Sequence, residues 1–254
     1  SNIRNVITNN GEISLNQHKN IIKKDNDFVK MFGNLMASLN KSIQNGLKDS
    51  DKLNNIGINL NVFNENKNAF IIDPGNFSEE ETKVLENFIA ENDLKVQNIL
   101  LTHAHIDHVF GLQKAFDHYK VPVLMHELDQ EILDRNPLDA NRFGFFFKPF
   151  AGEVSYLKEN DILKLDEDEF KILHVPGHSP GSIAFYNEVE NFMISGDVLF
   201  EGSIGRTDLY KGNSEQLLEN ITTKLFVLPE QTKVYNGHGN LTTIGFEKNH
   251  NPFF

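Results

Sequence analysis

Residues able to bind a metal ion are concentrated at positions 102–108, where the sequence reads Thr-His-Ala-His-Ile-Asp-His. The cluster directly follows a short apolar run that is typical of a buried strand. Alternate side chains of an extended segment lie on one side, so we expect His103 and His105 to face the same point. Asp107 and His108, one turn later, are then expected to face a second point nearby. Imidazole and carboxylate groups are suitable ligands for zinc, iron or manganese.

Three further segments offer donors of the same kind. His178 lies in Gly-His-Ser-Pro-Gly, Asp197 in Ser-Gly-Asp and His238 in Gly-His-Gly. Each follows a strand-like run, and each is next to glycine, which lets the backbone approach a crowded site. A single His or Asp in such a turn is more often structural or exposed. Seven donors in four segments, each of which follows a strand-like run, instead favour a metal centre.

The elements that would position these donors alternate between strand-like and helical patterns from about residue 56 onward, which predicts an α+β layered domain. A capping box of Ser78 and Glu81 indicates the start of one helix. Apolar spacing predicts a second helix over 109–119, and Ser214 is the expected N-cap of a third near 215–226. Strands are expected at 69–72, 99–101, 121–124, 169–175, 182–186, 192–195 and 233–235.

The first part of the chain differs in character from the rest. Residues 1–55 hold eight Lys and Arg against five Asp and Glu, a local charge of +3. Residues 56–254 hold 16 Lys and Arg against 31 Asp and Glu, a local charge of −15. Asparagine is frequent among the first 68 residues, which is typical of a loosely attached extension. Apolar residues recurring between Phe28 and Leu39 predict one amphipathic helix there. We therefore expect an extension at 1–55 and a catalytic domain at 56–254.

Overall composition restricts the classes of function. The net charge of −12 argues against nucleic acid as the main partner. The chain has no cysteine, so disulfides, thiolate metal sites and cysteine nucleophiles are excluded. No apolar run approaches the roughly 18 residues of a membrane span, and no signal-peptide pattern is present, so a cytoplasmic location without membrane partners is expected.

The order Thr-His-x-His-x-Asp-His, Gly-His-Ser-Pro-Gly-Ser, Gly-Asp and Gly-His-Gly resembles the metallo-β-lactamase superfamily from about Ile56 to Phe254. The resemblance implies a four-layer αβ/βα sandwich with two metal ions at one edge, between the sheets. It also implies that His103, His105 and His178 bind the first ion. Asp107, His108 and His238 would bind the second ion, and Asp197 would bridge both.

Residues around the ligands are similar to the short glyoxalase II-like branch: 197–200, 202–209, and the ending at 243–247 and 251–253. This similarity implies a thioester hydrolase for a small hydroxyacylglutathione-type substrate, in which a metal-bridging hydroxide attacks the carbonyl carbon. Two divalent ions are expected, zinc first, with iron or manganese as alternatives. Asp107 would orient the hydroxide, and Arg206 would bind a substrate carboxylate. Asp73 is expected to support a ligand or form a turn rather than bind the metal.

Three other functions share parts of this pattern. A mono-iron persulfide dioxygenase also has the run Gly205-Arg206-Thr207-Asp208, although the complete second set of donors favours two metals and hydrolysis. A lactonase would need an apolar acyl pocket, for which the Phe-rich segment 142–150 is the only support. That segment is expected to cover a cleft, join a subunit interface or lie in the core, so it and the N-terminal helix are candidate surfaces for a homo-oligomer. A non-catalytic binding module is disfavoured because no donor is missing.

Overall fold

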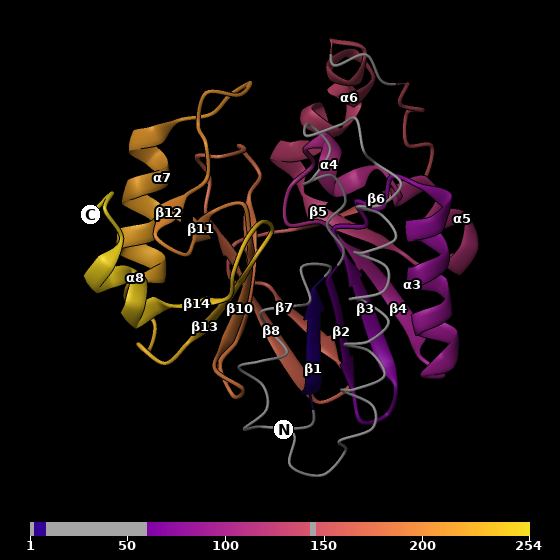
Figure 1. Cartoon of the computed structure of the whole chain (residues 1–254), viewed down its shortest axis with the longest axis horizontal. Helices are drawn as coiled ribbons and strands as arrows, with labels where there is room; N and C mark the ends of the chain where they lie inside the picture. Colours follow the sequence, from indigo (N-terminus) through magenta and orange to yellow (C-terminus); the bar gives the residue numbers. More distant parts are fainter. Residues whose placement is uncertain (1–2, 9–59, 143–145) are drawn as a thin grey trace, which may run out of the picture.

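The computed structural model describes residues 3–8, 60–142 and 146–254, and it contains two six-stranded sheets packed face to face (Figure 1). The first sheet has the order β1-β2-β3-β4-β5-β6, with strands Ile3–Thr8, Leu60–Asn64, Asn68–Ile72, Lys95–Leu100, Val123–His126 and Val154–Leu157. The second sheet has the order β14-β13-β10-β9-β8-β7. Its strands are β7 (Ile162–Leu165), β8 (Asp168–His174), β9 (Ile183–Asn187), β10 (Phe192–Gly196), β13 (Lys233–Asn236) and β14 (Thr242–Thr243). A short hairpin joins β11 (Leu199–Phe200) to β12 (Ser203–Ile204).

Strand directions bring the ends of several strands to common edges. In the first sheet β3, β4, β5 and β6 run parallel, with Ile71 opposite Ile99. In the second sheet β8 and β10 are both antiparallel to β9, and β13 is parallel to β10. Strands β8, β10 and β13 therefore all end at the same edge of the second sheet. The segments that follow them are consequently neighbours.

Helices cover the outer face of each sheet. The first sheet carries α3 (Glu79–Glu91), α5 (Leu112–Tyr119) and α6 (Gln130–Arg142), with the short α4 (Ile106–Val109) and the 3₁₀ turn η1 (Glu127–Asp129) at its edge (Figure 1). The second sheet carries α7 (Ser214–Asn220), the π-helical turn η2 (Ile221–Leu225) and α8 (Ile244–His250).

Three apolar cores hold these layers together, because the buried strands are apolar on both faces. In β3, Phe70 and Ile72 pack between the two sheets, whereas Ile71 packs under the helices of the first sheet. In β10, Ile194 points between the sheets and Met193 points towards α7 and α8. Continuous apolar runs of this kind are typical of strands buried on both sides. The expected four-layer αβ/βα sandwich is confirmed.

Local differences from the predicted elements have visible causes. The capping box of Ser78 and Glu81 is present at the start of α3. The helix expected over 109–119 is divided into α4 and α5 at Gly111, whose N–H donates to the Pro74 carbonyl at 2.7 Å. The prediction of Ser214 as N-cap is wrong: the Asn213 side chain caps α7 by accepting from Gln216 N at 3.0 Å.

Helix α6 was not predicted, and Pro137 lies inside it. A proline removes a backbone donor and usually ends a helix, so the sequence carried a signal against this element. The buried residues Ile132, Leu133 and Ala140 nevertheless lie on the face that packs into the core under the first sheet's helices. Tertiary packing therefore outweighs the local preference.

The extension and the Phe-rich segment are described only in part. Strand β1 lies within residues 1–55 and pairs antiparallel with β2, so this piece belongs to the first sheet. The predicted helix between Phe28 and Leu39 lies outside the described residues. In the Phe-rich segment, Phe147 contacts Phe110 with ring centroids 6.0 Å apart and is buried, whereas Phe146 is 90% exposed. Among the described residues no helix is long and apolar enough to cross a membrane.

Candidate metal centre

The seven predicted donors meet at the edge shared by the two sheets. The segment carrying the first four follows β4, and the others follow β8, β10 and β13, which end side by side. A backbone hydrogen bond from Ile183 N to the Thr102 carbonyl, at 2.8 Å, joins the two sheets here. Their donor atoms form two neighbouring groups: His103, His105 and His178 in one, and Asp107, His108, Asp197 and His238 in the other.

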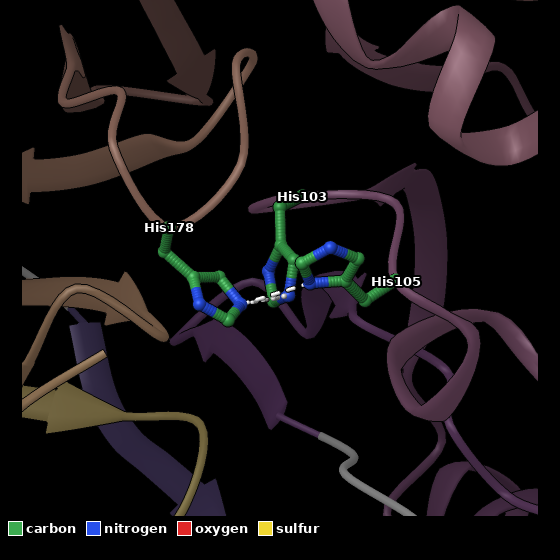
Figure 2. Close-up of side chains that lie close together, drawn as sticks. All are labelled: His103, His105 and His178. Carbon is green, nitrogen blue, oxygen red and sulfur yellow. Dashed lines mark hydrogen bonds between the residues drawn. The ribbon is translucent and has the colours of Figure 1, made fainter. Parts of the chain in front are cut away.

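The first group consists of three imidazoles that point at one another (Figure 2). Nε2 of His178 lies 2.8 Å from Nδ1 of His105 and 3.2 Å from Nε2 of His103. His103 and His178 are buried, and His105 is partly buried. The three inner nitrogens therefore lie close enough together to bind one cation.

The second group combines two carboxylates with two imidazoles. Nε2 of His238 lies 3.1 Å from Oδ2 of Asp107 and 3.4 Å from Oδ2 of Asp197. Nε2 of His108 lies 3.4 Å from Oδ1 of Asp197. The side chain of Asp107 is 31% exposed, so this group faces the solvent side of the centre.

Asp197 touches both groups. Its Oδ2 lies 3.7 Å from Nε2 of His178 in the first group and 3.4 Å from Nε2 of His238 in the second. Gly237 makes this approach feasible, since a Cβ there would lie 2.1 Å from Oδ1 of Asp197. The position between the groups is the one a bridging carboxylate requires.

Outer hydrogen bonds define which nitrogen of each buried ring carries its proton. Nδ1 of His178 lies 2.7 Å from the Arg206 carbonyl, which can only accept, so the proton is on Nδ1. Nδ1 of His103 lies 3.1 Å from the Thr102 hydroxyl, which donates its own proton to Oδ2 of Asp73 at 2.6 Å. His103 is therefore the donor to Thr102. Both inner Nε2 atoms are left with lone pairs.

This arrangement of lone pairs fits a metal ion. Two neutral imidazoles that face each other with lone pairs at 3.2 Å repel unless a cation lies between or beside them. In the second group, Nε2 of His108 and Oδ1 of Asp197 are buried 3.4 Å apart, and neither makes a hydrogen bond within the described residues. Buried polar atoms are normally hydrogen-bonded, so two such atoms that face each other without a hydrogen bond fit a cation site. The donor set of imidazole and carboxylate suits zinc or iron.

The local electrostatics keep three of the donors, His103, His105 and Asp197, in the forms that bind metal. Burial, together with the neighbouring His108, His178 and His105 rings, holds the pKa of His103 well below its usual value. Burial and the ring of His178 lower the pKa of His105 to about 3. Burial opposes ionisation of Asp197, but the adjacent His108 outweighs it and holds the pKa of Asp197 well below its ordinary range. His103 and His105 are thus neutral, and the carboxylate of Asp197 is charged.

The second group's imidazoles behave differently without a cation. Although burial disfavours a charged ring, hydrogen bonds to Asp107 and Asp197 raise the pKa of His238 to about 9. Burial likewise disfavours charge on His108, but the carboxylates of Asp197, Asp107 and Asp73 raise its pKa well above the usual value. A proton therefore occupies the place that a cation would take, and metal binding must displace it.

Asp73 lies behind the donors rather than among their inner atoms. Its carboxylate accepts from Thr102 N at 2.7 Å, from the Thr102 hydroxyl, and from Nδ1 of His108 at 3.0 Å. One carboxylate thereby orients His103, through Thr102, and His108 directly. Gly196, with a φ of 52°, allows Thr102 to approach, since a Cβ there would lie 2.2 Å from the Thr102 hydroxyl. This is the supporting position expected for Asp73.

Arg206 lies at the rim with its carbonyl and guanidinium in separate roles. The carbonyl accepts from His178, as described above. The guanidinium makes two hydrogen bonds of 2.7 Å to Asp208, and both side chains are more than 60% exposed. The Arg206 guanidinium, which was expected to bind a substrate carboxylate, is therefore partly occupied by the carboxylate of Asp208.

Two buried carboxylates near the centre have roles that the sequence analysis did not detect. Asp129, in η1, accepts from Ala104 N and Gly181 N, which flank donors of the first group. Glu247, in α8, accepts from Gly202 N at 3.0 Å and so holds the turn between β11 and β12. Glu247 lies within a motif already noted for its family resemblance, whereas Asp129 has no local signal.

A four-layer sandwich with a cluster of imidazoles and carboxylates at the edge of both sheets defines an enzyme of the metallo-hydrolase class. The chain belongs to the metallo-β-lactamase superfamily, whose profile matches residues 56–238. Membership indicates that the cluster binds divalent metal.

Individual relatives agree with this assignment. The hydroxyacylglutathione hydrolase GloC of Haemophilus influenzae is 41% identical over 194 residues, which cover 76% of this chain and 90% of that protein. The crystal structure of BLEG-1, a B3 metallo-beta-lactamase, superposes with a TM-score of 0.72 at 37% identity, covering 78% of this chain and 96% of the other. That of TTHA1623 in a di-iron-bound form gives a TM-score of 0.66 at 36% identity, with 73% and 89% covered.

Proposed function

We propose that this enzyme uses two divalent cations, zinc in the first instance, to hydrolyse a small thioester of the hydroxyacylglutathione type. The observation that carries the proposal is the convergence of seven donors in two groups with Asp197 between them. The relative named for hydroxyacylglutathione hydrolysis supports the substrate class, because it matches over three quarters of this chain. The di-iron form of TTHA1623 supports iron as the alternative metal.

The residues are assigned as follows. His103, His105 and His178 would hold the first cation, Asp107, His108 and His238 the second, and Asp197 both. When bound, two such cations lower the pKa of a shared water and polarise a carbonyl oxygen. Hydrolysis then adds the water oxygen to the carbonyl carbon, the carbon–sulfur bond breaks, and the thiolate leaves with the bonding electrons and takes up a proton.

The chain's own groups position the reactants. The carboxylate of Asp107 is the most exposed ligand oxygen of the second group, and it is held by His238, so it can orient the attacking water. The backbone carbonyl of Arg206 contacts His178 of the first group, and its guanidinium, now paired with Asp208, would bind a substrate carboxylate. No protein nucleophile is needed, in agreement with the absence of cysteine.

The test combines metal analysis with three assays on purified protein. We expect about two equivalents of zinc and hydrolysis of S-lactoylglutathione, without oxygen uptake on glutathione persulfide and with at most slow turnover of a cephalosporin. One equivalent of iron with oxygen uptake would instead identify a persulfide dioxygenase. Faster hydrolysis of the cephalosporin or of an acyl lactone than of the thioester would overturn the substrate class but retain the metal centre.

A further inference from the structure

The backbone N–H and C=O of Ala104, between His103 and His105, are both held by side chains of the η1–α6 segment. Its N–H donates to Oδ2 of Asp129 at 2.7 Å, and its carbonyl accepts from Nδ2 of Asn136 at 2.9 Å. Both side chains are buried, with 0% and 2% exposed. The N–H belongs to the peptide between His103 and Ala104, and the C=O belongs to the peptide between Ala104 and His105. Because each peptide is planar, these two hydrogen bonds orient both planes and so constrain the direction in which His103 and His105 leave the backbone.

The other oxygen of Asp129 holds the second segment of the first group. Oδ1 accepts from Gly181 N at 2.6 Å and from the Ser179 hydroxyl, which directly follows His178. Gly181 packs so closely that a Cβ there would lie 2.7 Å from Oδ1 of Asp129. One buried carboxylate therefore joins the His103–His105 segment to the His178 loop, although these are more than 70 residues apart.

The hydrogen bonds also show what Asp129 does not do. Both oxygens of Asp129 accept hydrogen bonds from the protein itself. The inner nitrogens of His103, His105 and His178 point towards one another and not towards Asp129. A second carboxylate, Asp73, contacts both groups, through His108 directly and through Thr102 to His103. Within the described residues, the hydrogen bonds of the Asp129 carboxylate reach only the two segments of the first group.

We infer that Asp129, assisted by Asn136, is a positioning residue for the first metal ion, an inference that rests on the proposed function. Its carboxylate holds the His103–His105 segment and the His178 loop together before the ion binds. Without it, the two segments can relax apart, and the ion must draw them together. Residues that orient metal ligands typically change affinity by about 10–100-fold when they are removed.

The experiment titrates metal-free Asp129→Asn with zinc in competition with a chelator, beside the wild type and Asp134→Asn. The amide keeps the shape of Asp129 but turns an N–H towards one of its donors. Asp134 is a matched control, because it is an exposed carboxylate in α6, which directly follows η1, and its Oδ1 accepts from the Gln130 side chain at 2.8 Å. We expect one of two zinc ions to bind about 10–100-fold more weakly in Asp129→Asn, and both to bind normally in Asp134→Asn.

Asn136→Ala serves if Asp129→Asn fails to fold, and the same site-selective loss is expected from it. Thermal unfolding of the metal-free proteins provides the second readout. A variant that unfolds earlier but binds both ions as the wild type does would show a purely structural role and overturn the inference, as would equal weakening of both ions. A wild-type protein that binds no metal would instead refute the proposed function.

Discussion

The carboxylate of Asp73 lies 3.0 Å from Nδ1 of His108, and both side chains are completely buried. The same carboxylate accepts from the Thr102 hydroxyl, which in turn accepts from His103. One acid therefore determines the tautomer of one imidazole in each metal group.

Replacing Asp73 by Asn should weaken both metal ions. The amide has a single acceptor oxygen, so its NH₂ group must face either Thr102 N or the two donors that now share Oδ2, the Thr102 hydroxyl and Nδ1 of His108. In either arrangement a donor loses its partner, and the segment or ring that it holds can move or change tautomer. We expect each zinc affinity to fall by about 10–100-fold, measured by chelator competition. Unchanged affinity for both ions would show that Asp73 only forms the turn.

Asp197→Ala should remove metal and abolish thioester hydrolysis, because the carboxylate of Asp197 lies between the two groups and contacts both. Elemental analysis after gel filtration measures the loss directly. As a control, Asp208→Ala removes an exposed carboxylate and should leave the metal content intact. Normal metal content in Asp197→Ala would contradict the bridging assignment.

Arg206→Met should raise KM for a carboxylate-bearing thioester about tenfold with a smaller effect on kcat, which corresponds to roughly 1.4 kcal/mol of binding. The metal content should stay at the wild-type value, since only the Arg206 carbonyl contacts His178. Asp208→Asn frees the guanidinium and should lower KM. An unchanged KM in both variants would remove Arg206 from the substrate site.

Glu247→Gln should lower the free energy of unfolding by about 1–3 kcal/mol, the usual cost of leaving a buried donor unpaired. The carboxylate is fully buried and accepts from Gly202 N, Thr242 and Asn251, and a neutral amide cannot serve all three. Urea denaturation of this variant can be compared with Glu215→Gln, an exposed helical position. Equal stability of the two variants would show that the donors find other partners.

His126 should make the protein less stable in mild acid. Burial and the ring of His174, stacked at 3.9 Å, lower the pKa of His126 to about 4, against the opposing effect of Glu127 and Glu159. A lowered folded-state pKa means that the stabilising contribution is complete above about pH 6.5 and is lost as pH falls towards 4.

The matched variant for this prediction is His126→Asn, whose side-chain oxygen can replace Nδ1 as acceptor from Leu128 N. The difference in unfolding free energy between pH 7 and pH 5 should be smaller in the variant by roughly 1 kcal/mol. Identical pH dependence in the two proteins would show that His126 does not titrate in this range.

The donors could be predicted from the sequence because each lies in a short segment next to a turn, and the segments resemble one family in their order. Strands β3, β4, β5, β8, β9, β10 and β13 were predicted for a related reason, since continuous apolar runs such as that of β3 identify buried strands without tertiary information. Strands β1, β2, β6, β7, β11, β12 and β14 were not predicted. Asp129 and Asn136 could not be found in this way. Their partners lie 25 to 52 residues away in sequence, and their positions depend on α6, a helix whose own pattern Pro137 obscures.

The donors come from both sheets, and the sheets meet through rings such as Phe70 and Phe170, whose centroids are 5.8 Å apart. The free energy of metal binding therefore depends on the packing that keeps the two sheets in contact. A cavity made at that distant contact, as in Phe170→Ala, should appear as weaker cation binding even though no ligand is touched. By reciprocity, removing the ions with a chelator should speed hydrogen exchange in the strands between which they sit.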